Sequence, residues 1–232
     1  MSVRQTSNWV SLSDLMTGLM LVFLLISILT ISQIVKQEEE RKKLLFEFDV
    51  VKTEIYNDLK ETFGDKENIW GIEIARDLSI KFENPDVLFG YLSTNITQEF
   101  ELILDEFIPL YISIINNPKY EDKIKEVRIE GHTANWDDYI FTIKLSQGRS
   151  NAVLAYILAN QYFNNLVAED QKKVKFWLTA NGLGNGRTID SEGKFTFYSG
   201  EDTSINSRRV EFRIVTTSDE LIDKIISNYT NN

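Results

Sequence analysis

A run of uncharged residues near the start of the chain limits most strongly what the chain can fold into. From Leu15 to Val35 there are 21 consecutive residues without a charge, most of them Leu, Ile, Val, Met or Phe. As a helix rising about 1.5 Å per residue, this run spans roughly 30 Å, the thickness of a bilayer core. A cleaved signal peptide is the alternative, but its apolar run has only about 7–15 residues and ends at a small-residue cleavage site, which is not found here. We therefore predict an uncleaved single-pass transmembrane helix over residues 10–35, preceded by a short tail of residues 1–9.

Asp14 lies at the start of this apolar run. An ionised carboxylate in hydrocarbon is strongly penalised, so it must face protein or water, or be protonated. Helical spacing places Ser11, Thr17 and Gly18 on the same side, and such a stripe of small and hydroxyl-bearing residues suits close contact with another helix. We predict that Asp14 takes up and releases a proton, supported by Ser11 and Thr17. The alternative is that Asp14 lies at headgroup depth and caps the helix.

Composition narrows the classes of function. The chain has 35 Asp and Glu against 25 Lys and Arg, which argues against nucleic acid as a direct partner. It has no cysteine, so a disulfide, a thiolate metal site and a cysteine nucleophile are excluded. With a single histidine, His132, a zinc site or a histidine-based triad is disfavoured. We therefore expect no metal and no cofactor.

A charged connector without proline follows the apolar run, over residues 36–68. Its apolar residues Leu44, Phe48, Val51 and Ile55 are spaced by four, three and four, which predicts a short helical seam that continues the membrane helix. A seam of fewer than three heptads is a weak coiled coil, so it suggests a dimer. A solvated spacer helix is the alternative.

The rest of the chain, from about Trp70, mixes two patterns. Alternation of apolar and polar residues predicts strands, and apolar residues at helical spacing predict helices. The predicted strands are 72–74, 78–82, 125–133, 174–182 and 208–215, and the predicted helices are 96–115, disturbed at Pro109, and 144–161. Together they predict an α/β sandwich, a mixed sheet with helices on one face. We assign this domain to residues 69–217, followed by a C-terminal helix or tail, residues 218–232.

The stretch NWVSLSDLMTGLMLVFL, residues 8–24, resembles the transmembrane motif of MotB-type stator subunits of ion-driven motors. It resembles more closely the ZorB subunits of the Zorya anti-phage system. Trp9, Thr17 and Phe23 stand where that motif has a tryptophan, a hydroxyl and an aromatic residue. The resemblance implies that Asp14 is the proton carrier.

The same resemblance implies a motor of the bacterial inner membrane. Two copies of the chain would lie inside a pentameric ring of a multi-span MotA-like or ZorA-like partner, with H⁺ as the coupling ion and Na⁺ as the alternative. The N-terminus would be cytoplasmic and the C-terminal domain periplasmic. The four positive charges within residues 36–43, against Arg4 before the span, would favour the opposite orientation by charge alone. In stator relatives the connector can act as a plug against ion leak.

Four short motifs in the C-terminal domain resemble, in order and spacing, the OmpA-like peptidoglycan-binding domain. They are IEGHT at 129–133, LSQGRSNAV at 145–153, GLG at 182–184 and NSRRVEF at 206–212. The resemblance implies that the loop after GHT and an arginine of the LSxxR helix hold the diaminopimelate part of the cell-wall peptide. The candidate residues for peptidoglycan binding are Thr133, Asn135, Thr142, Leu145 and Arg149.

The chain departs from that motif at two positions. Ala134 occupies the usual aspartate position, and an alanine cannot bind an ammonium electrostatically. Thr142 stands where an asparagine is usual. Asn135, Asp137 or Asp138, in the same loop, could replace the missing carboxylate. The alternative is a domain that keeps the fold and dimerises or binds another ligand.

Three other features are expected to be structural. His132 ends a strand motif. The GLGNG stretch at 182–186 is not followed by the helix that a phosphate-binding loop needs. Arg208 and Arg209 lie along a strand, and pairing with a carboxylate is the default expectation for them.

These observations favour a proton-conducting motor subunit, anchored to peptidoglycan, that powers an anti-phage defence system and is not an enzyme. One alternative is a flagellar-type or TolR-like stator subunit, which would use the same ion transfer at Asp14 to drive a different process. The other alternative is a passive envelope tether without ion flux, in which Asp14 would have no functional role.

Overall fold

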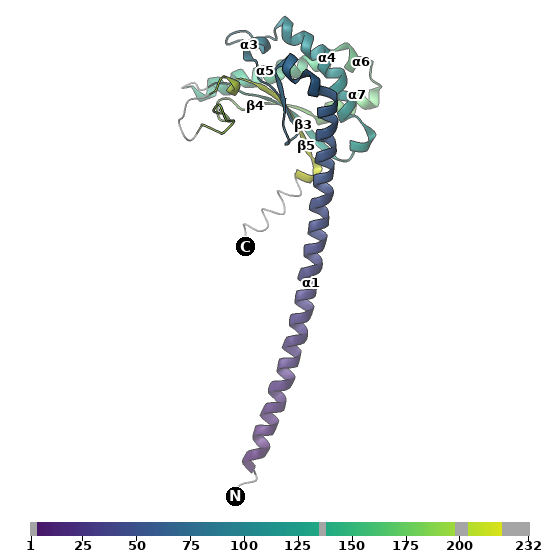
Figure 1. Cartoon of the computed structure of the whole chain (residues 1–232), viewed down its shortest axis with the longest axis vertical. Coiled ribbons are helices and arrows are strands. Elements are labelled where there is room, and N and C mark those ends of the chain that lie inside the picture. The colour runs from purple at the N-terminus through teal and green to yellow at the C-terminus, as the bar shows by residue number, and fades with distance from the viewer. Residues whose placement is uncertain (1–3, 135–137, 198–203, 220–232) are drawn as a thin grey trace. The chain divides into compact units, whose positions relative to one another are not determined.

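The computed structural model describes residues 4–134, 138–197 and 204–219 (Figure 1). The chain divides into two compact units, Met1–Asp49 and Val50–Asn232. Asn135, Asp137 and nearly all of the predicted C-terminal segment 218–232 lie outside the described residues.

The first unit is helical from Arg4 onward and belongs to α1, Arg4–Phe63. Its segment Leu12–Lys43 reaches a mean hydropathy of 2.4 with no part buried, and it is the one span within the described ranges that is long and apolar enough to cross a membrane. The hydroxyls of Thr17, Ser27 and Thr30 each donate to the backbone carbonyl four residues earlier. These bonds satisfy the hydroxyl donors within the helix, which lets the helix keep them in an apolar surrounding.

The last turns of α1 belong to the second unit and pack into its core. Ile55, Leu59 and Phe63 are fully buried, and the four-residue spacing puts them on one helix face. Val51 also packs against this core. The prediction of an intermolecular seam is therefore wrong for Val51 and Ile55, because the domain's own core covers them. The side chains of the other two seam residues lie outside the described ones.

The second unit contains a five-stranded mixed sheet with the strand order β1-β2-β5-β3-β4. The strands are β1 Ile72–Ile74, β2 Ser79–Phe82, β3 Ile124–Gly131, β4 Leu178–Gly182 and β5 Val210–Thr216. Strands β3 and β4 are parallel, and the other neighbours are antiparallel. The predicted fold class, an α/β domain with a mixed sheet after an apolar N-terminal helix, is confirmed.

Helix α2, Glu67–Trp70, precedes β1 after a 3₁₀ turn at Gly64–Lys66. The α-helices between strands are α3 Pro85–Leu88, α4 Gln98–Ile115, α5 Tyr139–Ala159, α6 Gln161–Asn165 and α7 Ala168–Trp177, with 3₁₀ turns at Pro118–Tyr120 and Ile205–Ser207. Helix α4 continues through Pro109. Helix α5 begins five residues earlier than predicted, because the carboxylate of Asp138 accepts a hydrogen bond from the backbone N–H of Phe141 and caps the helix.

One sequence prediction for the sheet is wrong. The residues VKFW, 174–177, were expected to begin a strand, but they form the last turn of α7. Val174 and Trp177 are both buried and lie three residues apart, on one face of a helix. The strand β4 begins only at Leu178, beside Val127 of β3.

The sheet has one apolar and one charged face. On the apolar face Ile80, Phe212 and Ile129 are neighbours across three strands, and Phe107 of α4 packs on Phe212 with ring centroids 4.9 Å apart. Helices α4, α5, α6 and α7 lie on the same side of the sheet (Figure 1). The opposite face carries Glu73, Lys81, Glu130, Glu211 and Arg213, as strand alternation requires.

Candidate functional sites

Asp14 is the only acidic residue on α1 before Glu38 among the described residues, and its side chain is exposed in the isolated chain. Thr17, one turn on, donates its hydroxyl to the carbonyl of Ser13 at 2.8 Å, so its lone pairs remain free to accept a hydrogen bond. A Cβ added to Gly18 would meet nothing within 4 Å, so this side of the helix is open. The side chain of Ser11 lies outside the described ones. The arrangement offers one titratable carboxylate beside a hydroxyl and an open, small-residue surface.

The motifs IEGHT, LSQGRSNAV and GLG meet where α5 crosses the ends of β3 and β4. An ideal Cβ on Gly131 would lie 2.4 Å from the carbonyl oxygen of Ser146, and one on Gly182 would lie 2.4 Å from the backbone nitrogen of Gln147. The glycines of the GHT and GLG motifs are therefore needed for close helix–sheet packing. The Ser150 hydroxyl donates to the carbonyl of Asn181 at 2.8 Å and strengthens the same contact.

Thr133 and Thr142 both adjoin the loop that follows β4. The backbone N–H of Thr133 donates to the carbonyl of Gly184 at 3.0 Å. Thr142 is fully buried, and its hydroxyl bonds to the carbonyl of Tyr139 at 2.7 Å and to Oδ1 of Asn185 at 3.2 Å. Thr142 therefore joins the start of α5 to this loop and is not exposed to a ligand.

The hydroxyl of Thr133 is buried and has no hydrogen-bond partner within the part of the chain that the structure describes. Leu145, on the next turn of α5 after Thr142, is also buried. Ala134 is half-buried at the position where the motif has its aspartate. Asp138 is exposed, but its Oδ1 is engaged as the cap of α5. Among the described residues of this loop, Thr133 thus has an unpaired hydroxyl, and Asp138 has a carboxylate that already caps α5.

Arg149 contacts a different segment. Its Nε donates to the carbonyl of Ser93 at 3.0 Å, and its guanidinium lies 5.0 Å from the ring centroid of Phe89. Burial, followed by the charge of Arg208, lowers the pKa of Arg149 to about 10, so the side chain remains charged at pH 7. No described carboxylate pairs with it. The structure thus places Arg149 on the same helix as Thr142 and Leu145 but ties it to the loop before α4.

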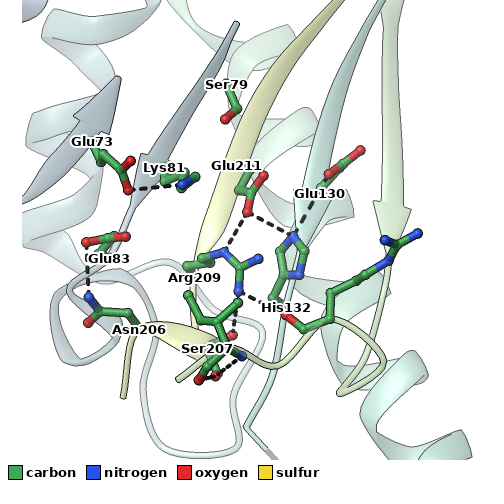
Figure 2. Close-up of polar contacts among 12 residues, drawn as sticks. Glu73, Ser79, Lys81, Glu83, Glu130, His132, Asn206, Ser207, Arg209 and Glu211 are labelled. Atoms are coloured by element: carbon green, nitrogen blue, oxygen red, sulfur yellow. Dashed lines mark hydrogen bonds and ion pairs between the residues drawn. The ribbon is translucent and has the colours of Figure 1, made fainter. Parts of the chain in front are cut away.

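A buried ionic cluster on the opposite face of the sheet was not predicted (Figure 2). Arg209 donates its Nε to Glu211 at 2.5 Å, so the pairing expected for Arg209 is present. Arg213 bridges Glu211 at 2.9 Å and Glu130 at 3.3 Å. His132 lies among these residues with 2% of its surface exposed.

The electrostatics of this cluster follow from burial. Burial lowers the pKa of His132 to about 3, with Arg209 the next largest cause, so the imidazole is neutral at pH 7. Burial also raises the pKa of Glu130. For Glu211 burial acts to raise the pKa, but interactions with His132, Arg209 and Arg213 outweigh it and leave that pKa lowered. Alternation along β3 and β5 could have predicted that these side chains share one face of the sheet. It could not have predicted that residues after β4, such as Arg187 and Phe195, lie beside them.

Comparison with known proteins gives two matching relatives. No family model matches the chain. The chain is 38% identical to Zorya protein ZorB of Escherichia coli strain Crooks over 233 residues, which cover 96% of this chain and 94% of that protein. It is 23% identical over 210 residues to a Zorya protein ZorB of a second Escherichia coli strain, covering 89% of this chain and 79% of that protein.

Solved structures also match the chain, at low sequence identity. A putative MotB like protein from Desulfovibrio vulgaris is 18% identical with a TM-score of 0.47, covering 73% of this chain and 97% of that one. The periplasmic domain of Helicobacter pylori MotB is 20% identical with a TM-score of 0.38, covering 66% of this chain and 87% of that one.

Proposed function

Because the chain belongs to the family of Zorya protein ZorB, we propose that it is the proton-conducting subunit of a membrane motor that serves anti-phage defence. The observation that carries this proposal is the isolated carboxylate of Asp14 at the start of the uncharged segment of α1, beside the open surface at Gly18. In this role the chain moves an ion and is not an enzyme.

The proposed assembly has two copies of the chain inside a pentameric ring of a MotA-like or ZorA-like partner. The surface at Gly18 allows a partner helix to approach the backbone closely, which brings Asp14 next to the ring. Protonation neutralises the carboxylate and releases it from one hydrogen-bonded position, and loss of the proton on the other side engages it again. The transmembrane field supplies about 2.3 kcal/mol per charge per 100 mV, enough to bias each step.

Thr17 has a supporting role in this scheme. Its hydroxyl hydrogen is bonded to the carbonyl of Ser13, so its oxygen can accept the hydrogen of a protonated Asp14 or of a water beside it. Ser11, one turn before Asp14, would add a second hydroxyl on the same side. The coupling ion in this proposal is H⁺, and Na⁺ is the alternative that a sodium-free assay separates.

The second unit would anchor the assembly. We place the chain in the bacterial inner membrane, with the N-terminus in the cytoplasm and the sheet domain in the periplasm against peptidoglycan. The charged guanidinium of Arg149 supports a ligand with carboxylate groups. Thr133, Asn135 and Leu145 complete the proposed set from the motif, although Thr133 and Leu145 are buried in the described structure and would have to become accessible to contact a ligand. Thr142 holds the site in shape from inside. Ala134 leaves the ammonium of diaminopimelate without the usual carboxylate, so weak wall binding is expected.

The test of proton transfer is Asp14→Asn, which keeps the size and polarity of the side chain but removes its titration. In cells that carry the native defence system, phage plating should rise to the level of cells without the system. The matched control is Glu38→Gln, which removes a carboxylate at an exposed position of α1 beyond the apolar run and should leave protection unchanged. Full protection by Asp14→Asn at normal protein levels would favour the passive tether.

A further inference from the structure

We propose that Glu130, His132 and Glu211 bind a divalent transition-metal ion, with Zn²⁺ as the best match to their ligand atoms. The site is built by strand pairing. Glu130 of β3 lies directly opposite Glu211 of β5, and His132 follows two residues later on the same face of the sheet. The backbone N–H of His132 donates to the carbonyl of Arg209 at 3.0 Å and continues the β3–β5 pairing beyond the end of β3.

The distances suit a metal ion. One ligand atom from each of the three residues lies within 4.8 Å of the others. His132 Nε2 lies 3.6 Å from Oε1 of Glu211 and 4.0 Å from Oε2 of Glu130. Zinc binds nitrogen and carboxylate oxygen at about 2.0–2.2 Å, so two ligands of a tetrahedral ion lie about 3.3–3.6 Å apart. The distance between His132 and Glu211 already fits this range, and Glu130 would have to move closer to both by up to about 1 Å.

His132 supplies a second, independent observation. Its side chain is almost fully buried, and neither ring nitrogen has a hydrogen-bond partner among the residues that the structure describes. Leaving a buried polar atom unpaired costs about 1–3 kcal/mol. The ring points toward the two carboxylates (Figure 2), so an ion at the centre of the trio would satisfy Nε2 directly.

The charges around the site are close to balanced without an ion. Asp77, Glu130 and Glu211 supply three carboxylates against the guanidinium groups of Arg209 and Arg213 and that of Arg187, which lines the same cavity. Arg128, also in this lining, is paired with Glu126. Each carboxylate oxygen has two lone pairs, so Glu211 can accept from Arg209 and still bind an ion. Hydrogen bonds to ligating carboxylates orient them, and Arg209 and Arg213 would do so here while lowering the affinity by repulsion.

An ion can reach this position from solvent. Glu130 and His132 line a cavity of about 460 Å³, together with Leu183, Arg187 and Phe195. This cavity also has room for a water as the fourth ligand. A bound ion would tie β3 to β5 and fix the backbone at His132, immediately before Thr133 and Ala134. Its role would therefore be to hold the start of the loop that carries the wall-binding motif.

The test uses the full-length chain in detergent, without a histidine tag and after removal of metals with EDTA. Because His132 is the only histidine, any imidazole ligand must come from it. Titration with Zn²⁺ by calorimetry should give one ion per chain and raise the unfolding temperature. His132→Asn should weaken binding at least tenfold. Glu192→Gln, an exposed glutamate paired with Lys194, is the matched control and should bind as the unchanged chain does.

A direct spectroscopic measurement keeps the proposal testable if the His132 variant fails to fold. Co²⁺ added to the unchanged chain should produce the visible absorption of a four-coordinate nitrogen and oxygen site. The spectrum of hydrated cobalt alone, or Zn²⁺ binding that is equal in His132→Asn and the unchanged chain, would overturn the proposal.

Discussion

Lys52 of α1 forms an ion pair with Asp219, and the same carboxylate accepts hydrogen bonds from the backbone N–H and the hydroxyl of Thr216 at 2.9 and 2.8 Å. Thr216 is the last residue of β5, so this carboxylate joins the end of the central strand to α1. A second polar contact lies nearby in the helix, where the hydroxyl of Tyr120 donates to Asp58 at 2.8 Å. The last turns of α1 are therefore an integral part of the sheet domain.

The first prediction concerns Asp219. Burial acts to raise its pKa, but hydrogen bonds from Lys52 and Thr216 outweigh burial and hold the pKa below 3.8. A lowered pKa in the folded state stabilises the protein above pH 3.8, and this contribution is lost as the pH falls through the folded-state pKa. Because the carboxylate is about a third exposed, Asp219→Asn should lower the free energy of unfolding by only about 0.5–1.5 kcal/mol at pH 7.

Urea unfolding in detergent, followed by tryptophan fluorescence, measures this effect. The difference between Asp219→Asn and the unchanged chain should shrink between pH 4 and pH 2. Asp122→Asn, at an exposed position, is the control and should show no difference at pH 7. A difference for Asp219→Asn that is as large at low pH as at pH 7 would contradict the assigned charge.

The second prediction tests whether α1 belongs to the core. Leu59, near the end of α1, is fully buried in the core of the sheet domain. Leu59→Ala should lower the free energy of unfolding of the sheet domain by about 2–5 kcal/mol, because it removes buried methyl groups and leaves a cavity. Ile69→Ala, at a side chain that is 76% exposed, should change it by less than about 0.5 kcal/mol. Equal effects of the two variants would show that the helix end does not pack in the core.

The third prediction concerns the glycine of the GHT motif. A Cβ on Gly131 would lie 2.4 Å from the backbone oxygen of Ser146, and backbone cannot move aside as a flexible side chain can. Gly131→Ala should therefore destabilise the domain by about 1–3 kcal/mol by pushing α5 away from β3. Gly64→Ala, where the added atom meets nothing within 4 Å, is the matched control. Thermal unfolding should separate the two, and a stable Gly131→Ala would contradict the packing described here.

The sequence predicted the positions of the strands better than it predicted the helix turn before β4 and the packing of α1. Alternation identified β3 and β5, because one face of the sheet is apolar and the other charged. It failed at 174–177, where a buried helix turn before a strand mimics the pattern of a longer strand. It also assigned Val51 and Ile55 to a seam, because apolar spacing shows which helix face is buried but not what covers it.

The candidate sites show the same limit. The motif residues near Thr133 and Arg149 could be read from sequence, whereas the contact of Arg149 with Ser93 joins residues far apart in the chain. The pairing of Glu130 with Glu211 depends on the register of two strands, which alternation alone does not give.

The last prediction concerns Arg149 and the cell wall. Arg149→Ala removes a cation, the hydrogen bond to Ser93 and the stacking on Phe89, and it should reduce the amount of chain that sediments with purified peptidoglycan several-fold. Arg149→Lys keeps the charge without the planar hydrogen-bonding group and should give an intermediate result. Lys144→Ala removes an exposed cation from the same helix and serves as the matched control. Unfolding temperatures identify variants that are simply misfolded. If folded Arg149→Ala sediments as fully as the unchanged chain does, Arg149 has no part in wall binding, and its role is to hold the loop before α4.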